Sequence, residues 1–131
     1  SPLTTQELKT LASKVKAMGF DWLELPLENP DDFDHETAAQ IVKDNNLGVS
    51  ACAVMGSERD LIHEDKAVRD NGAAYICAAV DALHTLGGSN LVGPIYSAVG
   101  RVWQQTSDER AKDIDLLVTQ LTALSKYATD K

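Results

Sequence analysis

Residues 18–28 read Met-Gly-Phe-Asp-Trp-Leu-Glu-Leu-Pro-Leu-Glu, and this stretch decides the fold. Just before it, apolar side chains from Leu8 to Met18 recur at the spacing of one helix face. Gly19 permits the left-handed backbone conformation that ends a helix abruptly. Residues 20–25 then form a run of strand length that ends at a proline. The stretch therefore predicts a helix that turns directly into a strand.

The same order of helix, turn and strand recurs along the chain. Helical patterns begin after Thr4 or Thr5, after Asp34, after Asp65, and after Ser107 or Asp108. Strand-like runs cover residues 20–25, 49–54 and 90–96. Helices that alternate with short apolar strands are typical of a parallel sheet covered by helices. We therefore predict a single α/β domain over residues 1–131, with about three parallel strands and four helices.

Each predicted helix carries an apolar stripe that we expect to face the sheet. In the last helix the stripe consists of Ile114, Leu117, Val118, Leu121, Leu124 and Ala128. We also expect Trp22 to lie in the core between sheet and helices. The glycine-bearing turns at residues 46–48 and 86–88 are expected to end the second and third helices, and His35 and His84 are interpreted as surface groups.

The loops that follow the predicted strands are longer and more polar than the turns that precede them. They run from Pro26 to Asp34, from Gly56 to Asp65 and from Ser97 to Ser107. All three leave the carboxyl ends of parallel strands, which is the edge where α/β sheets and barrels hold their ligands. This asymmetry predicts where a functional site lies, but not its chemistry.

Composition argues against several classes of function. The chain has 131 residues and a formal net charge of −8, so its surface repels nucleic-acid phosphates and anionic membranes. No apolar run approaches the roughly 20 residues that span a bilayer, and no secretory signal opens the sequence. With two cysteines and no CxxC pair, we expect a reducing, cytoplasmic setting.

Two acidic clusters contain metal-ligating residue types, but their spacing favours structural roles. The run from Glu24 to Glu36 is interpreted as a solvated loop in which Asp34 caps a helix. Glu24 is the exception, because it lies within a strand, and we expect it to have a specific partner there, since burial without one would be costly. Residues 63–65, His-Glu-Asp, are consecutive, and a strand or helix would splay them apart. The alternative to a metal site is a structural role. In that case Asp65 caps a helix, and two ion pairs follow, Asp65–Arg69 and Lys66–Asp70.

Other candidate residues are a cysteine and several aromatic side chains. Cys52 has the chemistry of a nucleophile, but residue order shows no partner arrangement, and a small apolar strand residue is the commoner case. For a ring-binding pocket, Tyr96 and Trp103 are better candidates than Trp22 and Phe33, because they lie on or beyond a strand end. No glycine motif for a dinucleotide or a phosphate is present.

The stretch at 18–28 resembles the second-strand region of the sugar isomerase/epimerase family, the xylose-isomerase-like TIM-barrel group that includes the ketose 3-epimerases. The resemblance covers nearly the whole chain. It continues through Cys52-Ala-Val-Met-Gly-Ser-Glu-Arg-Asp-Leu61, Asp65-Lys-Ala-Val-Arg-Asp-Asn-Gly72, His84-Thr-Leu-Gly87 and Val92-Gly-Pro-Ile-Tyr-Ser-Ala-Val-Gly100. The D-x-x-x-R-x-x-G and G-P-x-Y-S-A patterns are its most specific elements in combination.

This resemblance implies a partial (β/α)8 TIM barrel. The chain resembles strands two to four of such a barrel with helices one to four, and the first strand and the second half lie outside it. A complete barrel has roughly 250 residues, which is well beyond this length. We therefore interpret the chain as an N-terminal segment of a sugar isomerase or epimerase.

The resemblance also implies the chemistry of the full-length relative. Such epimerases hold a divalent metal, Mn²⁺, Co²⁺ or Mg²⁺, through two Glu, an Asp and a His. The two Glu move a proton between opposite faces of a ketose through an enediolate, and the metal polarises the carbonyl. Those ligands belong to the missing half, so we expect no catalytic residue and no metal ligand in this segment, and no activity from it alone.

What the resemblance assigns to this chain is part of the wall of a pocket for a monosaccharide or related small substrate. Cys52 matches a pocket cysteine at the end of the third strand, and Gly93 and Pro94 match residues beside the sugar. Val99 stands where ketose epimerases often carry an aromatic residue, and this departure leaves the precise sugar open. The expected substrate-binding residues are Glu24, Cys52, Met55, Gly93, Pro94, Tyr96 and Val99.

Two alternative functions remain open from the sequence. One is a non-catalytic α/β module that binds a ligand or partner through its long loops. The other is the endonuclease IV-like, DNA-repair branch of the same barrel superfamily, against which the charge of −8 argues. Three strands without closure leave two open sheet edges, so we also expect a homo-oligomer, such as a dimer, or protection by further segments.

Overall fold

The structure is a computed structural model, and it describes residues 3–131. The chain forms two compact units, which we describe separately. The sheet unit comprises the residues up to Ala53 together with Ala79–Val92. The loop unit comprises Val54–Ala78 and Gly93–Lys131.

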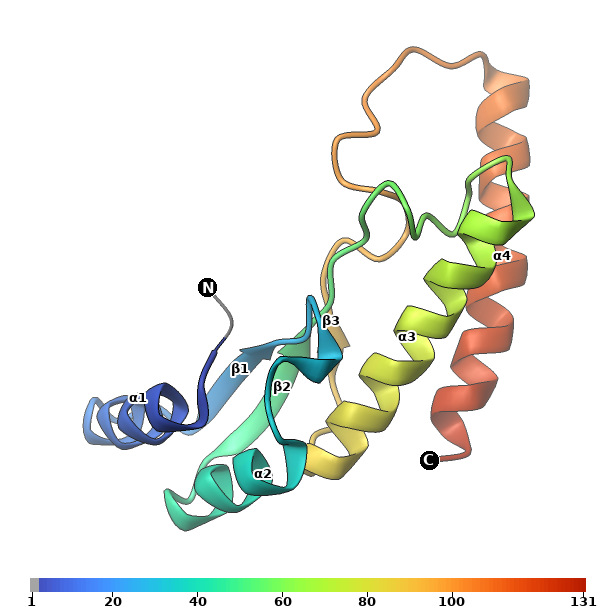
Figure 1. The fold of residues 1–131 in the computed structure, drawn as a ribbon. Helices are drawn as coiled ribbons and strands as arrows, with labels where there is room; N and C mark the ends of the chain where they lie inside the picture. Colours follow the sequence, from blue (N-terminus) through green and yellow to red (C-terminus); the bar gives the residue numbers. More distant parts are fainter. Residues whose placement is uncertain (1–2) are drawn as a thin grey trace. The chain divides into compact units, whose positions relative to one another are not determined.

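The sheet unit contains a three-stranded parallel sheet in the order β1-β2-β3. Leu23 of β1 pairs with Val49 of β2, and Cys52 of β2 pairs with Val92 of β3. The elements, shown in Figure 1, are α1 (Thr5–Ala17), β1 (Trp22–Pro26), a 3₁₀ turn (Pro30–Asp32), α2 (His35–Asp44), β2 (Gly48–Cys52) and β3 (Leu91–Val92). The helix α3 (Lys66–Leu86) begins in the loop unit and ends in the sheet unit.

The predicted α/β class, with three parallel strands and four helices, is therefore confirmed. One strand differs from its predicted extent. β3 contains only Leu91 and Val92, whereas the apolar run at 90–96 predicts a longer strand. The reason is local: Gly93 has a φ of +127°, which takes the backbone out of the extended conformation.

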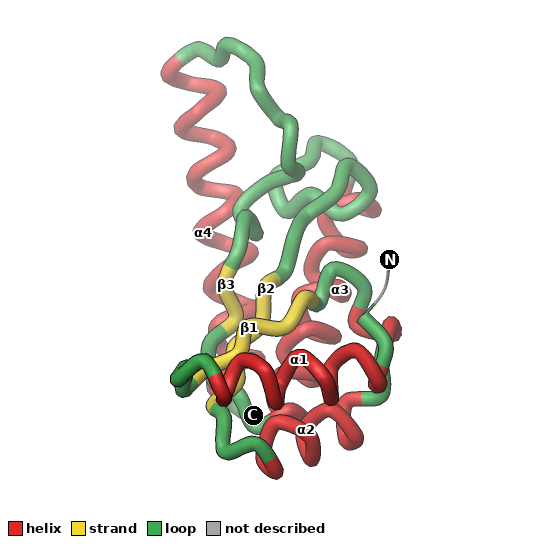
Figure 2. The backbone as a smooth tube through the Cα atoms, turned by 90° about the vertical axis from the view of Figure 1, so that its left-hand side faces the viewer, coloured by secondary structure: helices red, strands yellow, loops and turns green. Residues whose placement is uncertain are grey.

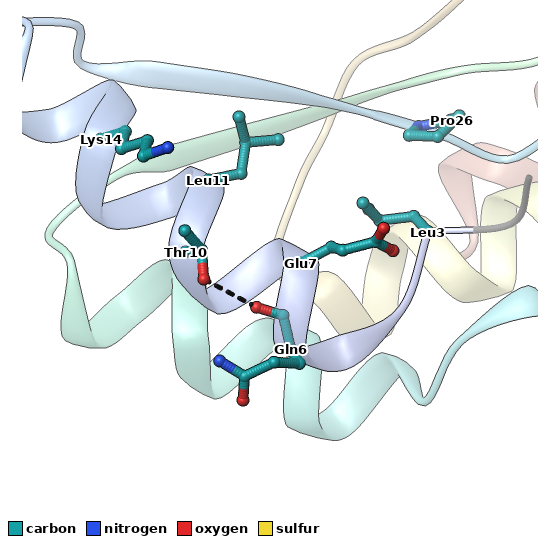
Figure 3. A pocket seen from close by; sticks show the side chains of 7 residues that line it. All are labelled: Leu3, Gln6, Glu7, Thr10, Leu11, Lys14 and Pro26. Atoms are coloured by element: carbon teal, nitrogen blue, oxygen red, sulfur yellow. Dashed lines mark hydrogen bonds between the residues drawn. The ribbon is translucent and has the colours of Figure 1, made fainter.

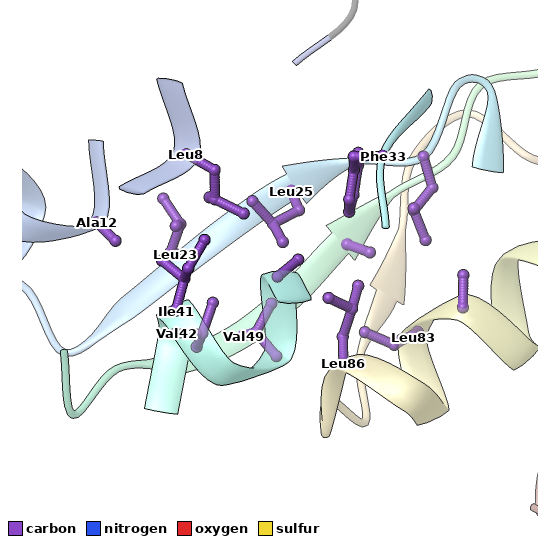
Figure 4. Close-up of a cluster of buried hydrophobic side chains, with 14 of the residues drawn as sticks. Leu8, Ala12, Leu23, Leu25, Phe33, Ile41, Val42, Val49, Leu83 and Leu86 are labelled. Carbon is purple, nitrogen blue, oxygen red and sulfur yellow. The ribbon is translucent and has the colours of Figure 1, made fainter. Parts of the chain in front are cut away.

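The hydrophobic core of the sheet unit lies on one face of the sheet. Alternation along β1 and β2 sends every second side chain to this face, including Leu23, Leu25, Val49 and Ala51. Helices α1, α2 and the end of α3 cover it, as the converging side chains in Figure 4 show. The helical side chains of this core are Leu8, Ala12, Ala38, Ile41, Val42, Ala79, Ala82, Leu83 and Leu86.

The prediction for Trp22 is wrong, because the alternation along β1 places its side chain opposite that of Leu23. Trp22 is 55% exposed and lies on the face of the sheet opposite the core of the sheet unit. Its ring lies over Gly48, the paired residue of β2, where a Cβ atom would come within 2.7 Å of the indole. Gly48 is therefore required by the neighbouring ring and not by a helix-ending turn.

The helix ends follow local sequence signals. Thr4 caps α1 with a reciprocal capping box to Glu7, and Asp34 caps α2 through a bond from the Thr37 amide. Left-handed residues end the helices at Gly19, with a φ of +89°, and at Gly87, with a φ of +79°. After α2 the left-handed residue is Asn46, with a φ of +50°, because Asn tolerates this conformation better than most side chains.

Phe33 and His35 are less exposed than the sequence indicates. Phe33, one of the weaker candidates for a ring-binding pocket, is buried in the core of the sheet unit. His35, predicted at the surface, is half-buried against it, with ring centroids 5.4 Å apart. The His35 Nε2 atom also lies 2.6 Å from the Pro30 carbonyl oxygen. His84 is exposed, as predicted.

The loop unit consists of the first half of α3, the helix α4 (Ser107–Thr129) and two long loops, at 54–65 and 93–106. The loop before α4 is drawn in green in Figure 2. The cap of α4 is Thr106, one residue before the predicted start. Of the apolar stripe predicted to face inward on α4, only Leu124 is buried, and Ile114 and Val118 are exposed.

Candidate functional site

The expected substrate-binding residues of the sheet unit are Glu24 and Cys52. Glu24 pairs with Ser50, and Cys52 pairs with Pro26, so both lie on the face of the sheet opposite the core of the sheet unit. Cys52 ends β2 with a free, half-buried thiol. Glu24 is exposed to solvent, so its carboxylate needs no specific partner, and the expectation of one is wrong.

The other expected residues lie in the loop unit, where the backbone brings three of them together. Met55 is fully buried, and its amide donates to the Pro94 carbonyl at 3.4 Å. The Val99 amide donates to the Met55 carbonyl at 3.0 Å. Gly93 starts this segment with its positive φ, and the Tyr96 side chain is exposed on it. The segment 93–99 is therefore fixed against residue 55.

Arg101, which the sequence analysis did not select, is the centre of a polar network in the loop unit. Its guanidinium donates to the Asp60 carboxylate at 3.0 Å, to the Ile62 carbonyl at 2.9 Å and to the Asp113 carboxylate at 3.1 Å. The side chains of Arg101 and Asp60 are only 15% and 3% exposed. Arg101 therefore connects the loop at 54–65, its own loop and helix α4.

The same network fixes one face of Trp103. The Arg101 guanidinium carbon lies 4.5 Å above the centre of the indole ring, a cation–π geometry. Gln105 adds a hydrogen bond from its amide nitrogen to Asp113 at 2.7 Å. Trp103 itself remains largely exposed. These partners are up to 41 residues apart in sequence, so no local pattern could have revealed them.

The D-x-x-x-R-x-x-G pattern at residues 65–72 has a structural explanation. Asp65 accepts a hydrogen bond from the Ala67 amide at the start of α3. Arg69 donates to the carbonyls of His63 and Glu64, at 2.6 and 2.8 Å, instead of pairing with Asp65. The predicted ion pair between Lys66 and Asp70 is present at 2.7 Å.

Gly72 completes this pattern because there is no room for a side chain at its position. A Cβ atom there would lie 3.2 Å from the carbonyl carbon and oxygen of Arg59 and 3.0 Å from the Met55 methyl group. One turn further along α3, Tyr75 accepts a hydrogen bond from the Val54 amide at 3.0 Å, with the Arg59 guanidinium 3.9 Å above its ring. These contacts hold the start of the loop at 54–65 against the helix.

The structure also bears on metal binding. The His63 ring accepts a hydrogen bond from the Asp65 amide at 3.0 Å, so the two side chains serve the local turn. Within residues 3–131 no group of three or more His, Cys, Asp and Glu side chains is placed to hold a metal ion. Within the same residues, no helix combines the length and the apolar character needed to cross a membrane.

The sheet unit also carries a groove of about 560 Å³ beside the outer strand β1. Its lining comes from Leu3, from one side of α1 and from Pro26 (Figure 3). The Thr10 hydroxyl in this groove donates to the Gln6 carbonyl at 3.1 Å, so that polar group is already satisfied. No expected substrate-binding residue lines the groove.

Comparison with known proteins shows which family has this architecture. The sequence profile described as "Xylose isomerase-like TIM barrel" matches residues 12–131. The chain belongs to this family. A ketose 3-epimerase of Arthrobacter globiformis is 30% identical over 89% of the chain and 45% of its own length. An L-ribulose 3-epimerase of Methylomonas sp. (strain DH-1) is 30% identical over 94% of the chain and 42% of its own length.

Solved structures of this family agree with the fold. The D-allulose 3-epimerase from Methylomonas sp., solved in complex with D-allulose, superposes with a TM-score of 0.85 at 26% identity. The match covers 97% of this chain and 43% of that one. The chain thus spans less than half the length of the relatives it matches. Its three strands and four helices are those of a partial TIM barrel.

Proposed function

We propose that this chain acts as one segment of a metal-dependent ketose 3-epimerase and supplies part of the wall of its sugar pocket. The observation that carries the proposal is the similarity of nearly the whole chain to two 3-epimerases of ketoses, each at 30% identity. The long loops leave the carboxyl ends of β2 and β3, which is the edge where barrel enzymes hold substrates.

The contacts within the loop unit support a pocket wall that is formed before substrate arrives. The two backbone hydrogen bonds of Met55 fix the segment from Pro94 to Val99, and Gly93 provides the turn that begins it. A wall of this kind positions a sugar without losing loop entropy on binding. We assign Tyr96 to contact with the sugar, because its ring is exposed on this fixed segment.

The residues of this chain do not fit a complete metal site. No suitable cluster exists among residues 3–131, and the exposed Glu24 and half-buried Cys52 do not make one. We therefore derive no catalytic step through a metal on this chain. In this proposal a Mn²⁺, Co²⁺ or Mg²⁺ ion and the acid and base are held by residues outside the segment, and the segment alone is inactive.

An epimerisation assay tests the proposal. The protein encoded by the complete reading frame around these residues should interconvert D-allulose and D-fructose, or another pair of ketoses that differ at carbon 3, in the presence of Mn²⁺. The 131-residue chain should not. Absence of epimerisation by the longer protein with every ketose would refute the assigned reaction, and activity of the 131-residue chain would refute its inactivity.

A further inference from the structure

The loop unit contains a small cavity between the loop at 93–106 and helix α4. Its volume is about 180 Å³, which is below the range of roughly 300–1,000 Å³ typical of sites for drug-sized ligands. A ligand of monosaccharide size is therefore the appropriate class. The residues that give the cavity its chemistry are Tyr96, Trp103, Gln105, Arg110, Ile114 and Leu117.

We propose that this cavity binds a neutral monosaccharide, with Trp103 as the platform on which the sugar ring stacks. The inference rests on the proposed function for its substrate class and adds a binding residue to it. Trp103 is 59% exposed although it is a large aromatic residue, and its ring borders the cavity. An indole presents an apolar face to the C–H groups of a sugar and a polar N–H at its edge.

The indole is fixed before any ligand arrives. The Arg101 guanidinium lies 4.5 Å above the ring and is itself held by two carboxylates and one carbonyl oxygen. A ring held in this way loses little freedom when a ligand stacks on it.

The charges around the cavity favour a neutral ligand over a phosphorylated one. Arg101 is engaged by Asp60 and Asp113, and together these three groups carry one net negative charge. Arg110 restores neutrality at the cavity wall. A phosphate would thus gain little attraction. Hydroxyl groups of a sugar can instead exchange hydrogen bonds with three groups that line the cavity: the Ser97 hydroxyl, the Gln105 amide oxygen and the Arg110 guanidinium.

A titration of the full 131-residue chain followed by NMR tests this site. The chain has two tryptophans, so its two indole N–H signals report separately on Trp103 and Trp22. Addition of D-fructose or D-allulose should shift the Trp103 signal and leave the Trp22 signal in place. Addition of D-fructose 6-phosphate should give no tighter binding than D-fructose.

Substitutions sharpen the test. Trp103→Leu should weaken binding by about tenfold, and Trp103→Tyr should keep most of it because an aromatic face remains. Phe20→Leu is the matched control, since Phe20 is also 59% exposed but lies in the sheet unit, and it should not change binding. Circular dichroism would show that each variant is folded.

Three outcomes would refute the binding site at Trp103: no shift of the Trp103 signal, equal binding by Trp103→Leu and Phe20→Leu, or much tighter binding of the phosphorylated sugar.

A different set of results would refute the proposed function. Sugar binding at Trp103 without epimerisation by the longer protein would refute the reaction alone, whereas epimerisation that is unchanged by Trp103→Leu, with no shift at Trp103, would refute the site alone.

Discussion

Three exposed carboxylates take part in the N-terminal caps of helices, and the hydrogen bonds of each cap lower the pKa of its carboxyl group. The backbone amide of Thr4 and then its hydroxyl lower the pKa of Glu7. The backbone amide of Thr106, followed by its hydroxyl, does the same for Glu109. For Asp34 the side chain of Thr37 contributes most, followed by the amide of that residue. In all three caps the hydrogen bonds are donated to the ionised carboxylate and stabilise it. For this reason all three pKa values are lowered.

These shifts predict the acid side of the stability profile. A pKa that is lower in the folded state adds stability above the unfolded value, which is 4.5 for Glu and 3.8 for Asp, and this stability is lost as pH falls through the folded pKa. Carboxyl ¹³C titrations should therefore give lower midpoints for Glu7, Asp34 and Glu109 in the native chain than in concentrated urea. Equal midpoints in the two states would show that the caps are not formed.

At Gly88 there is no space for a side chain. A Cβ atom there would lie 2.6 Å from the Val49 carbonyl oxygen and would also collide with the Leu83 side chain. Because the carbonyl belongs to the sheet backbone, it cannot move away easily. Gly88→Ala should destabilise the chain by about 1–3 kcal/mol in urea unfolding. Ser89→Ala, at the exposed neighbour, is the control, and an equal small effect of both variants would contradict the geometry.

At the scale of elements, the Arg101 network makes the sharpest prediction. Asp60 is almost completely buried, so loss of its cationic partner leaves an uncompensated buried charge. Arg101→Met should destabilise the chain by about 3–5 kcal/mol. The double variant Asp60→Asn with Arg101→Met should be less destabilised than the sum of the single variants, as urea unfolding would measure. Strict additivity would show that the two side chains do not interact.

The elements that could be predicted from sequence are those whose signals are local. Thr4 and Asp34 indicate where their helices begin, because each cap side chain accepts a hydrogen bond from an amide only three residues away. Gly19 ends a helix because its own backbone can adopt a positive φ. The Arg101–Asp60 pair joins positions 41 residues apart, so one sequence carries no trace of it. The candidate residues Met55 and Val99 were named from a resemblance, and only the structure shows the hydrogen bond between them.

Periodicity also predicts which face of an element is apolar, but not whether another element covers that face. Ile114 and Val118 lie in the apolar stripe of α4 and remain exposed. Trp22 has the size and polarity of a core residue, yet the alternation of β1 places it opposite Leu23, where it is exposed. Both errors arise from the assumption that an apolar side chain has its partner within the same chain segment.

For the whole molecule, the important feature is a sheet with two unpaired edges and with exposed apolar side chains on β1 and β3 among residues 3–131. Among residues 3–131 neither the outer edge of β1 nor that of β3 is paired with a further strand. Exposed edges offer unpaired backbone groups to other chains, and the exposed Trp22 and Val92 add apolar area to the same face. The net charge of −8 opposes association, because every copy repels every other.

The balance between these two effects predicts self-association that depends on salt. The isolated 131-residue chain should form dimers or larger oligomers, and association should strengthen as salt screens the charge repulsion. Trp22→Lys should weaken it by placing a charge at an exposed position of β1. Val102→Lys makes the same change in net charge on an exposed residue of the loop unit, and it should have little effect. Sedimentation velocity at low and high salt measures all three proteins, and a stable monomer under both conditions would show that the open sheet does not drive association.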